Sequence, residues 1–149
     1  MKLEEQVCSL ELAKTLKELG VKQESAFWWV EGDLVYRGEW GGPSDDASKR
    51  MEQKELDEYM HALFSAFTVA ELGELLPMTV YGEFDALVVE KAIRHWFVYY
   101  STDRSGNPSK WRGRLIQTAD TEVDACAKML IYLIENILLT LPTLEYPSR

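Results

Sequence analysis

The chain has 149 residues, of which 46% are hydrophobic and 28% charged, and this composition excludes a disordered chain. Its formal net charge of −9 opposes binding to the phosphates of nucleic acids. The length fits one domain, so residues 1–149 are expected to form a single folding unit.

The ends of the chain carry no recognisable export or membrane signal. The N-terminal stretch MKLEEQ is acidic and lacks the pattern of a signal peptide. The longest apolar run, residues 129–141, contains Glu135 and Asn136 and is shorter than the roughly 20 residues that a bilayer span requires. We therefore expect a soluble, cytoplasmic protein without a membrane partner.

Residues 9–20, SLELAKTLKELG, are predicted to form the first helix, because their apolar residues recur at the spacing of one helical face. The Ser9 side chain is expected to accept the free amide hydrogen bonds of the first turn. Gly20 is expected to end the helix.

The next stretch, ESAFWWVEGDLVYRGEWGG at residues 24–42, changes to a period of two and predicts a β-hairpin around Glu31-Gly32-Asp33. Its first strand is apolar on both faces. That pattern indicates either a strand covered on both sides or an exposed aromatic face that meets a partner or a second copy of the chain. We favour burial. The second strand is apolar on one face only, and this face is expected to lie against the core.

Residues 44–64 have the composition of a helix but poorly spaced apolar positions, so helix and loop both remain open. Residues 65–77 predict a short helix more clearly. Thr68 and Glu71 have the spacing of a capping box, and Pro77 ends the segment.

Segments rich in β-branched and aromatic residues follow between residues 84 and 118. The last two flank a polar loop at residues 102–110, which predicts a hairpin with a long connection. Residues 120–139 predict the longest helix, capped by Asp120 or Thr121. It is apolar on most faces and is expected to be buried.

These elements predict an α+β fold: a small, mainly antiparallel sheet of hairpins packed on a long C-terminal helix, with two shorter helices. Cys8 and Cys126 lie in apolar helical patterns. Both are expected to be small buried hydrophobes rather than disulfide partners or zinc ligands.

Three of the helical segments, VCSLELAKTLKELGVKQES, SAFTVAELGELLP and DTEVDACAKMLIYLIEN, resemble a group of small proteins of unknown function encoded in prophages and mobile elements of gut-dwelling bacteria. The resemblance covers about a third of the chain. It implies an intracellular protein from a mobile element, and it supplies no catalytic residue.

The sequence contains parts of several known functional motifs, and none of these motifs is complete. Residues 12–25 read like the opening of a helix-turn-helix, but strand-like residues follow where the recognition helix should stand. Glu58 and His61 have the spacing of half a di-iron site, and His95 lacks the context to complete it. Cys126 is a poor nucleophile inside an apolar helix. We expect no metal, no cofactor and no catalytic residue.

Charged and aromatic residues remain as candidates for binding a partner. The loop TDRSGNPSKWRGR at residues 102–114 is the one basic segment, and it is either a solvated loop or a contact for a protein or a nucleic acid. The candidate partner-binding residues are Trp28, Trp40, Asp45, Asp46, Glu52, Glu55, Arg104, Lys110, Trp111, Arg112 and Arg114.

The expected function is that of a non-catalytic acidic interaction protein from a phage or mobile element. Its partner would be a host regulator or defence factor with a basic surface. One alternative is a small enzyme or ligand-binding domain with a pocket between sheet and helix. Another is nucleic-acid binding through residues 104–114, and a homodimer also remains open.

Overall fold

The computed structural model describes residues 1–36, 54, 58, 60–80, 86–101, 116–136 and 138–139. Within them lie one 3₁₀ turn, three α-helices and six strands. In chain order these are η1 (Leu3–Glu5), α1 (Leu10–Glu18), β1 (Phe27–Val30), β2 (Asp33–Tyr36), β3 (Leu63–Ser65), α4 (Val69–Leu75), β4 (Ala86–Ala92), β5 (His95–Ser101), β6 (Ile116–Ala119) and α5 (Glu122–Glu135).

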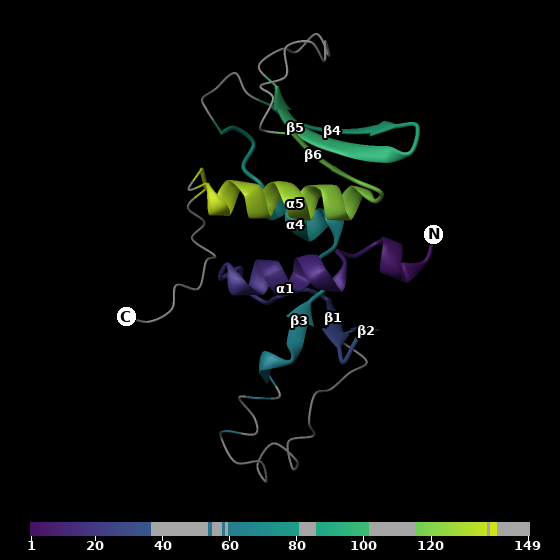
Figure 1. Ribbon diagram of the computed structural model, residues 1–149, viewed down its shortest axis with the longest axis vertical. Coiled ribbons are helices and arrows are strands. Elements are labelled where there is room, and N and C mark those ends of the chain that lie inside the picture. The colour runs from purple at the N-terminus through teal and green to yellow at the C-terminus, as the bar shows by residue number, and fades with distance from the viewer. Residues whose placement is uncertain are drawn as a thin grey trace.

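The strands form two antiparallel sheets, with the orders β2-β1-β3 and β4-β5-β6. Figure 1 shows the helices as a layer between them: α5 lies against the second sheet, and α1 lies on the side of the first. The predicted α+β class and the packing of the C-terminal helix on a sheet are therefore confirmed. The strands divide into two small sheets where the sequence suggested one, because β3 occupies the second edge of β1 and the hairpins pair separately.

β3 was not anticipated, since residues 44–64 were expected to be helix or loop. Trp28, Trp29 and Val30 pair in register with Ser65, Phe64 and Leu63. Residues Leu63–Ser65 become a strand because β1 offers them an unpaired edge. A strand of three residues has too little periodicity to be predicted from the sequence.

Strand β1 is the buried centre of the first sheet. Trp28 and Trp29 point to opposite faces, and their exposed fractions are 7% and 8%. The Trp29 indole Nε1 donates a hydrogen bond of 2.9 Å to the carbonyl oxygen of Cys8. Burial of the strand on both faces, the favoured interpretation, is confirmed. The neighbouring strand β2 is less covered, because Tyr36 is 47% exposed.

The helix ends agree with the sequence except at the start of α1, and Gly20, with a φ angle of 86°, follows the end of α1 as predicted. Thr68 and Glu71 form the predicted capping box of α4, and the Thr121 hydroxyl accepts a hydrogen bond from the Asp124 amide at the start of α5. The Ser9 side chain makes no capping hydrogen bond. Instead the Ser9 amide donates to Oδ1 of Asp124 over 2.8 Å, so a carboxylate 115 positions away along the chain occupies this helix start.

The long helix α5 forms the middle of the core, as its apolar sequence predicted. Its buried residues are Val123, Ala125, Cys126, Ala127, Met129, Leu130 and Leu133. It contacts β5 and β6 of the second sheet as well as the helices α1 and α4, so it connects that sheet with the rest of the helical layer. Within the parts of the chain that the structure describes, no helix has the length and apolarity needed to cross a membrane.

Candidate functional site

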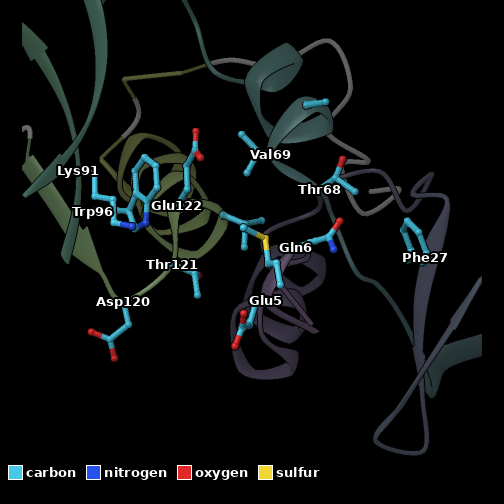
Figure 2. Close-up of a pocket in the computed structure, with 13 residues that line it drawn as sticks. Glu5, Gln6, Phe27, Thr68, Val69, Lys91, Trp96, Asp120, Thr121 and Glu122 are labelled. Atoms are coloured by element: carbon cyan, nitrogen blue, oxygen red, sulfur yellow. The ribbon is translucent and has the colours of Figure 1, made fainter. Parts of the chain in front are cut away.

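A cleft of about 610 Å³ opens on the side of the molecule where the starts of α4 and α5 meet the N-terminal segment. Figure 2 shows Lys91 and Trp96 on one side of it, Thr68 and Val69 on another, and Glu5 and Gln6 between them. The lining residues are Met1, Glu5, Gln6, Phe27, Thr68, Val69, Ala70, Lys91, Trp96, Asp120, Thr121, Glu122 and Val123.

Backbone pairing fixes the position of the N-terminal segment, whose residues Met1, Glu5 and Gln6 line the cleft. Val7 forms an antiparallel bridge with Thr68, and the Cys8 amide donates to the carbonyl oxygen of Phe67 over 2.8 Å. The bond from Ser9 to Asp124 then fixes the same segment to α5. Elements far apart in sequence therefore meet at one place through specific hydrogen bonds.

An aromatic wall is supplied by the β4–β5 hairpin. Lys91 and Trp96 are partners across the two strands, and the Lys91 ammonium nitrogen lies 5.6 Å from the Trp96 ring centroid. This geometry is within the range of a cation–π interaction. The Lys91 ammonium group therefore lies over the Trp96 ring in a contact made within the chain itself.

Carboxylates outnumber cationic side chains in the cleft lining. Among the residues that the structure describes, Glu5, Asp120 and Glu122 line it, against Lys91 as the single Lys or Arg. The positive end of a helix favours carboxylates nearby. At α4 and α1 that role belongs to Glu71 and Asp124, neither of which lines the cleft, whereas at α5 it belongs to Glu122, which does. The lining itself keeps a negative balance.

A histidine–carboxylate pair lies at the edge of the cleft. Nδ1 of His95 is 2.9 Å from Oδ1 of Asp120, and both side chains are largely exposed. His95 stands in a strand, as the sequence predicted. Its partner is Asp120, which lines the cleft.

The thiols are chemically quiet in this fold. Burial raises the pKa of the Cys8 thiol to about 12 and that of Cys126 to about 11. Both therefore stay protonated near neutral pH, where a thiol is a weak nucleophile. Glu58 and His61 are exposed. Among the described side chains, no group of three His, Cys, Asp or Glu residues is arranged to hold a metal ion.

The residues that the sequence marked for partner binding fall mostly outside the described part of the chain. This holds for Trp40, Asp45, Asp46, Glu52, Glu55, Arg104, Lys110, Trp111, Arg112 and Arg114. Trp28 is described and is buried, so little of its ring is available to a partner.

The cleft residues were missed because each has an ordinary local explanation. Asp120 and Glu122 read as helix-start acids, and Lys91 and Trp96 as strand residues. The sequence marked only the helix starts at Thr68 and Thr121, through their capping residues. Both of these residues line the cleft, but nothing in the sequence indicated that the two helix starts lie close together. Comparison of the chain with known protein families, with curated proteins and with solved structures finds no match.

Proposed function

We propose that the protein is a non-catalytic interaction protein whose cleft binds a partner segment carrying an aliphatic and a basic side chain. The observation that supports this best is the described lining, in which three side-chain carboxylates and one cationic side chain lie around Trp96, Phe27 and Val69. An apolar base with an acidic rim suits a lysine or arginine, whose stem is apolar and whose head is charged.

The energetics favour a protein segment over a free ion. Because Lys91 already lies over the Trp96 ring, the attraction for a basic side chain comes from the rim carboxylates, which add mainly to specificity and association rate. The net charge of −9 adds long-range attraction for a basic surface. The neighbouring aliphatic side chain would supply most of the buried apolar area.

The resemblance to mobile-element proteins makes a host regulator or defence factor the proposed source of this segment. Occupation of the partner's basic surface would be the mechanism, without any bond being made or broken. The chemically quiet thiols support a non-catalytic role.

A ligand-binding or enzymatic role is the second candidate, and one observation favours it. The cleft is bounded by the β4–β5 hairpin and the start of α5, its volume is within the usual range for small-molecule pockets, and His95 with Asp120 stands at its edge. In this case Asp120 would orient the histidine as a base.

The test is an NMR titration of ¹⁵N-labelled protein with two tetrapeptides that differ in one charge. These are acetyl-Gly-Leu-Lys-Gly-amide and acetyl-Gly-Leu-Glu-Gly-amide. The lysine peptide is expected to shift the signals of Glu5, Thr121 and the Trp96 indole, and the glutamate peptide is expected to shift none of them. Equal shifts with both peptides, or none with either, would contradict the proposal.

Two neighbouring glutamates provide a matched control. Glu4 and Glu5 belong to the same 3₁₀ turn, and only Glu5 lines the cleft. Glu5→Lys is expected to weaken binding of the lysine peptide about two- to fivefold, the effect of one partly screened charge. Glu4→Lys makes the same change in net charge and is expected to leave binding within error.

A further inference from the structure

Ile93, at the tip of the β4–β5 hairpin, is unusual both in its exposure to solvent and in its backbone conformation. Ile93 is 98% exposed, and its φ angle is +28°. It occupies the first position of the two-residue turn between Ala92 and His95, which are partners in the ladder. Glycine is the residue suited to a positive φ, and a β-branched residue is strained there. The fold gains no burial from this isoleucine.

The other hairpin shows the usual solution. Its turn is Glu31-Gly32, with φ angles of 51° and 88°, and it combines a polar residue with a glycine. Both turn residues are exposed. An exposed isoleucine in a strained turn therefore points to a contact made with another molecule.

The tip stands directly beside the cleft. Lys91 and Trp96, which line the cleft, are separated from the turn by the single pair Ala92 and His95. At about 3.3 Å per residue along a strand, the turn lies only some 7 Å beyond the cleft wall. Next to Ile93 stands Arg94, whose side chain is exposed.

The tip and the cleft are complementary to each other. Ile93 offers an aliphatic side chain and Arg94 a guanidinium, and the cleft offers the partly exposed Trp96, Val69 and Phe27 beside the carboxylates of Glu5, Asp120 and Glu122. We propose that a second copy of this chain docks its hairpin tip, Ile93 with Arg94, in the cleft, and that two copies do so reciprocally.

A two-fold arrangement follows from the shared location. Because tip and cleft lie on the same part of each subunit, one rotation brings each tip to the other subunit's cleft, as in an isologous interface. The net charge of −9 on each copy opposes association, so the dimer is expected to be weak and to form at high protein concentration. This inference rests on the proposed function, since it names an occupant of the same cleft. A basic partner and the second copy would compete for it.

The test is sedimentation equilibrium of the full chain from about 10 µM to about 1 mM, the range expected for a small interface. The wild type is expected to dimerise reversibly. Ile93→Asp and Arg94→Glu are each expected to weaken self-association at least about tenfold, as for a central interface residue. A wild-type chain that stays monomeric throughout would overturn the inference, and so would a dimer that survives Ile93→Asp.

Ile93→Gly separates binding from folding. Glycine relieves the positive φ, so the melting temperature is expected to stay equal or to rise while self-association falls. Glu31→Gly makes the same kind of change in the other hairpin and is expected to leave the dimer intact. If Ile93→Gly dimerises as the wild type does, Ile93 is not the anchor and the inference fails.

Charge exchange tests the pairing itself. Glu5→Lys combined with Arg94→Glu is expected to recover a substantial part of the association lost in Arg94→Glu, whereas Glu4→Lys with Arg94→Glu is expected to recover none. Recovery by both lysine variants, or by neither, would contradict docking in the cleft. The peptide titration is an independent test. If the chain stays monomeric and binds the lysine peptide, the proposed function is supported and the dimer is contradicted. If the chain dimerises as expected but does not bind the lysine peptide, the dimer is supported and the proposed basic partner is contradicted.

Discussion

The two sheets are both three-stranded and antiparallel, but they are joined to the helices in different ways. Side-chain hydrogen bonds tie the first sheet to its surroundings: Glu71 accepts from the Ala26 amide over 2.9 Å, and Lys17 donates to the carbonyl oxygen of Leu63 over 2.7 Å. The second sheet is packed on α5 mainly through apolar side chains, with Val98 and Tyr100 buried, and the Lys128 side chain of α5 also donates a hydrogen bond of 3.0 Å to the carbonyl oxygen of Thr118 in β6. The first sheet should therefore be sensitive to loss of single polar groups, and the second to loss of buried volume.

The largest expected effect is a cavity in α5. Leu133 is fully buried on the helix that supports the second sheet. Leu133→Ala is expected to lower the free energy of unfolding by about 2–5 kcal/mol, because the lost contacts leave a void that the core fills only in part. Urea denaturation measures this. Glu135→Ala, an exposed change on the same helix, is expected to stay within about 0.5 kcal/mol. Equal stability of both variants would mean that α5 is peripheral.

A smaller effect is expected at the polar connection of the first sheet. The Glu71 carboxylate accepts hydrogen bonds from the Thr68 amide, the Thr68 hydroxyl, the Ser25 hydroxyl and the Ala26 amide. Glu71→Gln leaves one acceptor oxygen for four donors and is expected to cost about 1–3 kcal/mol.

Hydrogen exchange locates that loss. The Ala26 amide is expected to exchange faster in Glu71→Gln, and amides of β5 are expected to change less. Glu74→Gln, an exposed residue three positions along α4, serves as the matched control and is expected to leave both sets unchanged. Uniform acceleration across both sheets would show that the two regions open together rather than separately.

The smallest effect on the free energy of unfolding near neutral pH is expected from the Cys8 and Cys126 thiols, because their contribution to it changes only at alkaline pH. Burial raises the pKa of Cys8 to about 12, whereas an unfolded thiol ionises near roughly 8.5. Between these values the unfolded state binds fewer protons than the folded state. The stabilisation is therefore complete below about pH 8.5 and is lost as the pH rises toward 12.

Urea unfolding between pH 8 and pH 11 measures this slope. Cys8→Ala is expected to make it shallower, and so is Cys126→Ala, because burial also raises the pKa of Cys126 to about 11. Burial of Tyr100 raises its pKa too, so part of the slope remains in both variants. An identical slope in all three proteins would show that neither thiol is linked to folding.

Much of the local structure followed from short stretches of sequence. The capping box of Thr68 and Glu71, the turn at Gly32 and the apolar surface of α5 each depend on residues within a few positions of one another. Capping, turn conformation and helical periodicity act over this range, so one chain segment contains the whole signal. Burial of the tryptophan-rich strand was favoured because the strand is apolar on both faces, but that pattern was also compatible with an exposed aromatic face that meets a partner.

Only the tertiary structure decided how these elements meet. Asp124 reads as a helix-start acid of α5, yet its carboxylate accepts a hydrogen bond from the start of α1. Leu63–Ser65 becomes a strand because β1 has an edge to pair with. The cleft combines Glu5, Lys91 and Glu122 from three distant segments. Such contacts depend on which surfaces remain after the core has formed, and no periodicity within a single segment encodes that outcome.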